Sequence, residues 1–566
     1  MIRLHPVKIP DLAMFLIGIC TVFLAGCKTR SVPASTLPAP TVPSETAMAP
    51  LPPTVTASPV PTATPVPPVG VWLAPYLPDS IRHAVELPAG FVQTSSPESA
   101  QAALRPGEGH PLARWVYALV APFPTTADGV TFQDLRSSWN GTPAGPFGSA
   151  PLLVDADTLQ VFTDLWGAPA GGAVKTLPAE QLLDYAWENQ PAWAILPFEA
   201  LEPKWKILQV DGISPIRKEF DIDGYPLTVP FTLSGDPTMA QPLLEAMKAQ
   251  EIEFPITNRD PEKMSTVMLT GVTALVRAAA EEMRRHGMTY PARFIGPLLR
   301  DADILHISNE IPFTKDCPHP DTHQVELVFC SRPEYIELLD DIGTDIVELT
   351  GDHFGDQGPD AMRFTLDLYK ERGWPYYGGG YNQEDARQAK LIEHNGNKIA
   401  FIGCNAKGGG YATARGENPG AVACDWDWMS QEIARLRSEG YNVITTFQHF
   451  EYYTYTPQPK QIADSRRMVE AGANIVSGSQ AHQPQGMEFY QDGFIHYGLG
   501  NLFFDQFFMG VPTSQGFLDE YVFYDNRHIS TDLTGIYFID YASARLMTAE
   551  EKQALLESVF VASGWR

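Results

Sequence analysis

With 566 residues the chain is too long for one hydrophobic core, and 44% hydrophobic against 19% charged residues is typical of a globular protein. We therefore expect two folded domains with some unstructured sequence beside them. The formal net charge of -27 repels phosphate backbones, which excludes nucleic acid as an expected partner.

The first 27 residues have the pattern of an export signal. Arg3 and Lys8 precede an apolar run over residues 12–25, which is too short for a transmembrane helix. The run ends in Leu24-Ala25-Gly26-Cys27, which resembles a lipobox. We expect cleavage before Cys27 and lipidation of its thiol, so that a lipid anchor holds the protein on the extracytoplasmic face of the cell membrane. An ordinary secretory signal is the alternative.

Residues 28–70 are mostly Pro, Thr, Ser, Ala and Val. This segment has almost nothing large to bury, and its prolines favour extended polyproline II. We expect a disordered stalk that holds the following domains away from the membrane.

Residues 71–250 alternate between apolar strands and helical stretches, which predicts an α/β domain. We expect strands at 115–121, 193–197, 206–210 and 229–233, and a helix that begins near Thr131. The segments GVTFQDLRSSWNG (129–141) and AWAILPFEAL (192–201) resemble those of type 2 periplasmic substrate-binding proteins of the phosphate kind. The resemblance implies a small anion as ligand, without assigning ligand residues. A spacer or docking module is the alternative.

A second α/β pattern runs over residues 262–545, followed by a helical tail at 546–566. Its polar motifs follow predicted strands, where the functional residues of such folds gather. The expected strands lie at 265–269, 303–307, 345–349, 399–402, 442–447 and 474–476, and the expected helices at 274–286, 333–341, 360–372, 429–438 and 461–471.

Five of these motifs, taken in order, resemble the CapA / poly-γ-glutamate capsule-synthesis family, which has a four-layer α/β/β/α metallophosphatase-like fold. The matching segments are 270–277, 302–310, 330–353, 443–452 and 471–482, and residues 495–505 match the family's closing motif. Three ligand positions differ from the family pattern. Val272 stands in place of an aspartate, and Ser479 and Gln480 stand in place of histidines.

The resemblance implies roles for the polar residues that remain in these motifs. The implied metal ligands are Glu310, Asp352, His449 and His482, the implied catalytic residues are His353 and His449, and the implied substrate-binding residues are Asn309, Asn382 and Asn501. The lost ligands weaken a two-metal site. We therefore expect one divalent metal ion, Mn²⁺ or Zn²⁺, or a metal-free polar cleft.

Four cysteines remain after Cys20 and Cys27 are set aside with the signal. An even number in an exported protein predicts disulfides, and four cysteines allow three pairings. Closure of local loops favours Cys317–Cys330 and Cys404–Cys424. Free buried thiols, or a zinc site formed by the first pair with His319 and His323, are the alternatives.

These observations predict a lipoprotein that acts in synthesis, export or anchoring of an anionic surface polymer, together with other capsule-synthesis proteins. It would act as a hydrolase or transferase with an incomplete metal site. One alternative is a non-catalytic lipoprotein that binds a polymer or solute and keeps only the fold. Another is a sensor, in which the first domain reports a solute to the second.

Overall fold

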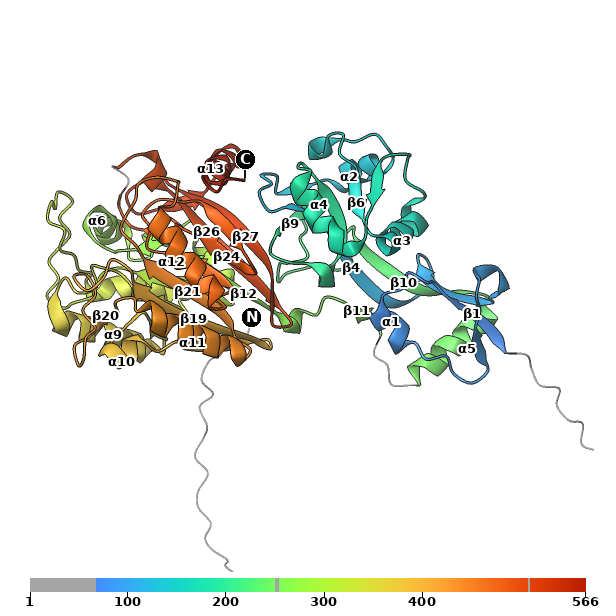
Figure 1. Cartoon of the computed structure of the whole chain (residues 1–566), viewed down its shortest axis with the longest axis horizontal. Helices are drawn as coiled ribbons and strands as arrows, with labels where there is room; N and C mark the ends of the chain where they lie inside the picture. Colours follow the sequence, from blue (N-terminus) through green and yellow to red (C-terminus); the bar gives the residue numbers. More distant parts are fainter. Residues whose placement is uncertain (1–67, 250–253, 507–508, 566) are drawn as a thin grey trace, which may run out of the picture. The chain divides into compact units, whose positions relative to one another are not determined.

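A computed structural model describes residues 68–249, 254–506 and 509–565 (Figure 1). The predicted signal peptide, Cys27 and nearly all of the predicted stalk lie outside these residues. Strand β1 begins at Val69, two residues before the predicted start of the first domain. None of the helices in the described ranges combines the length and the apolar character needed to cross a membrane.

The N-terminal part forms an eleven-stranded mixed sheet with the main order β2-β1-β3-β10-β4-β8-β6-β7. The long strand β4 is its axis, because it pairs with β8, β9, β10 and β11. The strands are β1 (Val69–Leu73), β2 (Phe91–Gln93), β3 (Ala102–Pro106), β4 (His110–Pro122), β5 (Gly129–Val130), β6 (Leu152–Val154), β7 (Val174–Thr176), β8 (Trp193–Pro197), β9 (Trp205–Val210), β10 (Thr228–Gly235) and β11 (Ile256–Thr257).

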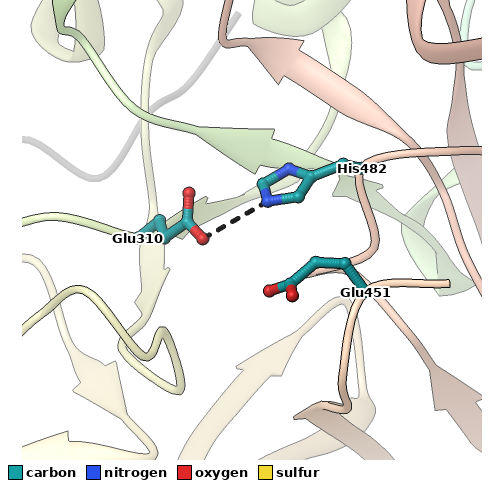
Figure 2. A group of neighbouring side chains, drawn as sticks. All are labelled: Glu310, Glu451 and His482. Carbon is teal, nitrogen blue, oxygen red and sulfur yellow. Dashed lines mark ion pairs between the residues drawn. The ribbon is translucent and has the colours of Figure 1, made fainter. Parts of the chain in front are cut away.

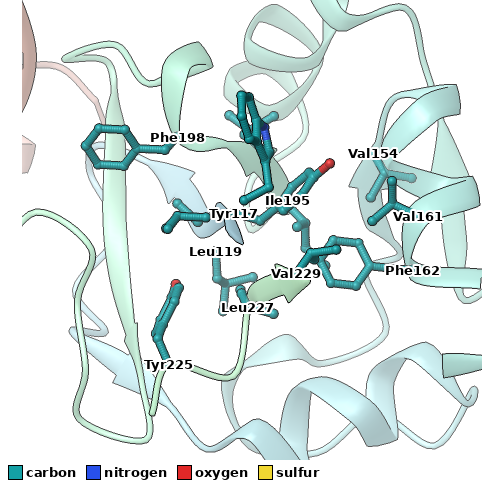
Figure 3. Close-up of a cluster of buried hydrophobic side chains, with 14 of the residues drawn as sticks. Tyr117, Leu119, Val154, Val161, Phe162, Ile195, Phe198, Tyr225, Leu227 and Val229 are labelled. Carbon is teal, nitrogen blue, oxygen red and sulfur yellow. The ribbon is translucent and has the colours of Figure 1, made fainter. Parts of the chain in front are cut away.

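Five helices accompany this sheet, and three of them begin after Thr131, Asp155 or Asp236, whose side chains cap the helix N-terminus. Thr131 accepts a hydrogen bond from the Asp134 amide at 3.1 Å, and Asp155 accepts one from the Thr158 amide at 2.7 Å. The core lies along β4 and β8, and Figure 3 shows Tyr117 and Leu119 among its side chains. The helices are α1 (Asp79–Ala84), α2 (Phe132–Trp139), α3 (Ala156–Trp166), α4 (Leu182–Glu188) and α5 (Pro237–Lys248).

The C-terminal part contains two larger sheets and one two-stranded sheet. The nine-stranded sheet comprises β12 (Met264–Thr270), β13 (Val272–Thr273), β14 (Ile304–Asn309), β15 (Ile346–Glu348), β16 (Tyr376–Tyr377), β25 (Asn501–Phe503), β26 (Gln515–Tyr524), β27 (Arg527–Phe538) and β28 (Ala544–Leu546). The six-stranded sheet comprises β18 (Lys390–His394), β19 (Asn397–Asn405), β21 (Asn442–Gln448), β22 (Ile475–Ser477), β23 (Met487–Tyr490) and β24 (Gly493–His496). The small sheet pairs β17 (Gly379–Gly380) with β20 (Gly420–Ala421).

Three apolar cores hold these layers together. One core contains Leu269 and Ile304 from the first sheet and Phe401 and Ile444 from the second, so the two sheets pack face to face. A second core joins the nine-stranded sheet to α6 (Arg277–His286), α7 (Gly296–Asp301), α8 (Ile336–Ile342) and α9 (Gly358–Arg372). A third joins the six-stranded sheet to α11 (Trp426–Ser438) and α12 (Pro459–Glu470). The predicted α/β/β/α order is confirmed.

Two features differ from the predicted elements. The helix expected from residue 274 begins at Arg277, because Val272 and Thr273 pair as β13 with β14 and β25. The long antiparallel hairpin of β26 and β27 was not predicted, and β26 pairs with β12 inside the sheet. Strands β12, β14 and β15 run parallel, as do β19, β21 and β22, so each set brings its carboxyl ends to one edge. The short helix α10 (Gln383–Ala386) and the C-terminal helix α13 (Ala549–Ala562), which begins within the predicted tail, complete this part.

Candidate metal centre

Glu310 is a buried carboxylate without a hydrogen bond. It follows β14 directly, its side chain is about 1% exposed, and neither carboxylate oxygen has a hydrogen-bond partner among the described residues. Burial raises the pKa of Glu310, and the charges of His482 and His353 act against this rise. A buried carboxylate in this state needs a proton or a cation beside it, so Glu310 fits a metal ligand.

His482 faces Glu310 with its free ring nitrogen. The Nε2 atom lies 3.6 Å from Glu310 Oε1, and the Nδ1 atom lies 2.9 Å from Asn501 Oδ1 (Figure 2). An amide oxygen only accepts hydrogen bonds, so Nδ1 carries the proton and the Nε2 lone pair is directed away from Asn501. This arrangement fixes the ring as a nitrogen ligand.

Glu451 completes a set of three potential ligands. Each of Glu310, Glu451 and His482 has one ligand atom that lies within 4.8 Å of the ligand atoms of the other two. Figure 2 shows the Glu451 carboxylate near the other two groups. A second set within the same limit comprises Glu310, Asp352 and His353. Carboxylate oxygens combined with an imidazole nitrogen suit Mn²⁺ or Zn²⁺ better than Ca²⁺.

Lys407 supplies a cation between two of these carboxylates. Its Nζ atom lies 2.6 Å from Asp352 Oδ2 and 2.5 Å from Glu451 Oε1, and its side chain is 5% exposed. Gln448 holds the same carboxylates, because its Nε2 donates to Asp352 Oδ1 at 2.7 Å and to Glu451 Oε1 at 3.1 Å. Burial opposes ionisation of Asp352, but the charges of His353 and Lys407 and these hydrogen bonds hold its pKa below the usual value.

His353 carries a proton beside these carboxylates. Its Nδ1 donates to Asp356 Oδ2 at 2.8 Å, and its Nε2 lies 3.9 Å from Asp352 Oδ2. Burial acts to lower the pKa of His353, but the hydrogen bond to Asp356 and the charges of Glu310 and Asp352 raise it to about 9. At neutral pH the ring is therefore an imidazolium, which can donate a proton or bind an anion.

The structure places His449 outside both sets of ligands. Its Nε2 lies 3.4 Å from Asp464 Oδ2, and the ring borders a small cavity with Phe447 and Phe450. Burial lowers the pKa of His449 to about 3, so the ring is neutral. Glu451, two residues later, is the side chain from this loop that reaches Glu310. Among the described residues His449 therefore joins neither set of ligands, and its catalytic role stays a prediction.

The three asparagines predicted to bind substrate all make local contacts. Asn309 is buried and its Nδ2 donates to the Ile311 carbonyl at 2.7 Å. Asn382 caps α10 by accepting a hydrogen bond from the Asp385 amide at 2.9 Å. Asn501 orients His482, as described above. Contact of these asparagines with a substrate stays a prediction.

Two of the three positions that differ from the family pattern, Val272 and Ser479, carry no metal ligand in this fold. Val272 is fully buried in an apolar cluster that also contains Ile311, Phe329 and Phe504. The Ser479 hydroxyl donates a hydrogen bond to the buried carboxylate of Glu348. Neither position offers a charged oxygen or an imidazole to a second metal ion.

Both predicted disulfides are present. Cys317 pairs with Cys330 and Cys404 pairs with Cys424, which closes loops of 13 and 20 residues. Because the sulfur atoms of Cys317 and Cys330 are bonded to each other, they do not form the alternative zinc site.

Sequence reasoning missed Lys407 and Gln448 and did not assign Glu451. Gln448 is the last residue of β21, and Lys407 comes two residues after the end of β19, so all three residues lie at or just after strand ends. Their position at or after the ends of predicted strands was the feature of the sequence that could have indicated a place in the site.

Searches of solved structures find similarity to each part of the chain. A phosphate transport receptor from Vibrio cholerae is 14% identical, with a TM-score of 0.27, and covers 33% of this chain and 94% of its own. The NAD nucleotidase of Haemophilus influenzae is 10% identical, with a TM-score of 0.31, and covers 52% of this chain and 55% of its own. At these TM-scores the similarities carry no information about ligand or activity.

The sequence comparisons are more specific for the C-terminal part. The capsule biosynthesis protein CapA of Bacillus anthracis is 27% identical over 277 residues, which is 48% of this chain and 67% of that protein. The PGA biosynthesis protein CapA of Bacillus subtilis is 24% identical over 264 residues, which is 46% of this chain and 68% of that protein. Residues 232–506 match the family described as "Bacterial capsule synthesis protein PGA_cap". The C-terminal part of this chain is therefore similar, over residues 232–506, to the PGA_cap family of bacterial capsule synthesis proteins.

Proposed function

We propose that this protein is an envelope-anchored accessory factor in the synthesis, export or anchoring of an anionic capsule polymer of the poly-γ-glutamate kind. The family match over residues 232–506 and the named roles of the two CapA relatives support this proposal. Partners in a capsule-synthesis complex belong to the same proposal.

The C-terminal part would bind one divalent metal ion, Mn²⁺ or Zn²⁺, through Glu310, Glu451 and His482. The observation that carries this assignment is the buried Glu310 carboxylate, whose two oxygens have no hydrogen bond although His482 Nε2 lies 3.6 Å away. A metal ion bound there would supply Lewis-acid chemistry and lower the pKa of a bound water molecule.

A second metal ion is not expected, because Lys407 already provides a positive charge between Asp352 and Glu451. The ammonium group neutralises Asp352, the carboxylate of the second ligand set that would otherwise attract a further cation. The loss of charged ligands at Val272 and Ser479 has the same consequence.

The charged side chains beside the metal ligands suit an anionic substrate. Lys407 and protonated His353 are cations at the edge of a cluster of carboxylates. His353 Nε2 is free of the hydrogen bond that Nδ1 makes to Asp356, so it can hold a substrate oxygen or give it a proton. We propose that His353 acts as the proton donor in a slow hydrolase or transferase reaction.

Metal content of the full-length chain, purified in detergent, tests this assignment directly. After equilibration with Mn²⁺ or Zn²⁺ and removal of free ions, the wild type should hold about one equivalent, because the two ligand sets share Glu310 and Lys407 is paired with Asp352 of the second set. Glu310→Gln and His482→Gln should lose most of it. His449→Gln is the matched control and should retain the metal, because His449 contacts Asp464 instead. Two equivalents in the wild type, or loss of metal in His449→Gln alone, would contradict the assignment.

A second candidate is a non-catalytic lipoprotein that binds a polymer or solute and keeps only the fold. It is favoured by Lys407, which satisfies Asp352 and Glu451 without any metal ion. Absence of bound metal, together with absence of hydrolysis of poly-γ-glutamate and of phosphodiesters, would support this candidate.

The proposed lipid anchor is tested separately at Cys27. Cys27→Ala should move the protein from the membrane fraction to the soluble fraction, because the acyl chains are lost. If the variant stays membrane-bound and unprocessed, the apolar segment at 12–25 is an uncleaved anchor instead.

A further inference from the structure

Residues 76–199 enclose a cleft of about 610 Å³ that is separate from the candidate metal centre. Its walls come from α1, the middle of β4, the first turn of α3 and the end of β8. Clefts of this size hold small molecules or cofactors. No role in the proposed capsule function depends on this cleft.

The charges in the cleft are mainly negative. Asp79, Asp155, Asp157 and Glu199 line it, and Arg82 is the one basic residue among the described lining residues. The Arg82 guanidinium is engaged by two backbone carbonyl groups, at 2.6 and 2.9 Å from Nη2. Burial and the charge of Asp155 raise the pKa of Asp157, the charge of Arg82 acts against this rise, and the charge of Asp79 adds to it. A phosphate or another small anion would be repelled by this surface.

The N-terminus of α3 offers no binding site for an anion, although it borders the cleft. The Asp155 carboxylate already accepts hydrogen bonds from the Thr158 amide at 2.7 Å and from the Thr158 hydroxyl at 3.1 Å. A carboxylate of the chain itself therefore occupies the place where an anionic ligand would bind.

Tyr117 adds a polar group to the cleft. The side chain is 3% exposed and lines the cleft, and its hydroxyl is not among the fully buried unpaired atoms of the described residues, so the hydroxyl opens into the cleft. Its ring packs edge-on against Phe162, with 5.1 Å between the ring centroids, and Figure 3 shows both rings within the core. Burial raises the pKa of Tyr117, and the charges of Glu199, Asp155 and Asp157 raise it further. The same three carboxylates line the cleft beside it. A hydroxyl that opens into the cleft from an otherwise buried side chain is placed to bind a ligand there.

The spacing of the carboxylates excludes a bare metal ion as the natural occupant. No three of these carboxylates bring ligand atoms within 4.8 Å of one another in the part of the chain that the structure describes. Separated carboxylates suit a longer ligand with more than one positive or hydrogen-bonding group. Trp115 and Tyr117 provide aromatic rings beside them, and aromatic faces attract organic ammonium groups. The Trp115 indole also donates to Glu199 Oε1 at 3.1 Å, which fixes this carboxylate in the wall.

We propose that this cleft binds a small organic ammonium ion, such as an aliphatic amine or diamine, and not phosphate. The sequence resemblance implied a small anion for this domain, and the charges of the cleft oppose that expectation. Asp157 and Glu199 bind the ammonium groups, and the Tyr117 hydroxyl accepts a hydrogen bond from one of them.

Isothermal titration of the full-length chain in detergent, with 1,4-diaminobutane and with inorganic phosphate as probes, tests the proposal. The diamine should bind, and phosphate should not. Asp157→Asn should weaken diamine binding about tenfold or more, which is the usual effect of losing one charged hydrogen bond. Tyr117→Phe should weaken it less and leave the fold intact, since only the hydroxyl is removed. Asp184→Asn is the control of equal charge change, because Asp184 is exposed on α4 and does not line the cleft.

Each other outcome would overturn the proposal. If phosphate binds and the diamine does not, the ligand of this domain is a small anion, as the sequence resemblance implied. If neither probe binds, the cleft does not bind a small amine. Diamine binding that Asp157→Asn leaves unchanged would place the amine elsewhere, for example at the acidic residues of the metal centre. Binding of Mg²⁺ or Ca²⁺ that depends on Asp157, without diamine binding, would make the cleft a metal site.

Discussion

Removal of the Lys407 ammonium group should expose how far the metal centre depends on it. Lys407→Met keeps most of the side-chain volume and removes the cation shared by Asp352 and Glu451. The side chains of Lys407 and Asp352 are each 5% exposed, so water does not replace the lost charge. Removing one partner of a buried ion pair lowers the free energy of unfolding by about 3–5 kcal/mol. Because Glu451 is 23% exposed and Gln448 still donates to Asp352, we expect the lower end, about 3 kcal/mol.

The assay is urea unfolding of the full-length chain, first in chelator and then with Mn²⁺. In chelator the variant should be less stable than the wild type by the amount given above. Mn²⁺ should raise the unfolding free energy of the variant more than that of the wild type, because the freed carboxylates can bind a second ion. At a Mn²⁺ concentration of 100 times Kd, one bound ion contributes about 2.7 kcal/mol. Its metal content should rise above one equivalent.

Lys398→Met is the matched control. Lys398 lies 4.0 Å from Glu393 with 43% of its side chain exposed, so its removal should cost less than about 1 kcal/mol and leave metal content unchanged. If Lys407→Met costs no more than this control, and Mn²⁺ gives it no additional stability, the role assigned to Lys407 is wrong.

Three further changes should have measurable effects. Asn501→Ala should lower metal affinity about 10–100-fold in a competition titration, because the His482 ring loses the partner that orients it. Burial lowers the pKa of His528 to about 4, so between pH 6.5 and 4 the unfolded chain binds a proton that the folded chain does not. The contribution of neutral His528 to the unfolding free energy is therefore fully present above pH 6.5 and falls by at most about 1.4 kcal/mol per pH unit below pH 6.5. In urea unfolding, His528→Gln should reduce this dependence of stability on pH. Replacing Cys404 and Cys424 by serine should lower the unfolding free energy by about 3 kcal/mol, since the bond closes a loop of 20 residues.

Each of these changes has a control and a result that would contradict it. Asn382→Ala removes only the cap of α10 and should leave metal affinity unchanged, so equal losses in both asparagine variants would point to general unfolding. An unchanged pH slope in His528→Gln would mean that His528 titrates normally in the folded chain. Equal stability of the double serine variant and the wild type, both measured without reductant, would show that the disulfide contributes nothing.

The sequence alone determined the kinds of secondary structure and their order, because these depend on local patterns. The strand predicted at 193–197 is β8, and the helix predicted at 360–372 lies within α9. Runs of apolar residues of strand length and the glycine after Arg372 carry this information without any long-range contact. The two disulfides were also predictable, since each closes a short loop.

Only the tertiary structure decided which polar residues meet. Glu310, Asp352, Lys407 and Glu451 follow four different strands, so pairing of β14 with β15 and of β19 with β21 had to bring them to one place. The resemblance to the CapA family implied His449 as a ligand. In the fold its ring lies against Asp464 of α12, and Glu451 reaches Glu310 instead. Side-chain direction in a loop after a strand is set by packing against distant elements, and no local pattern specifies it.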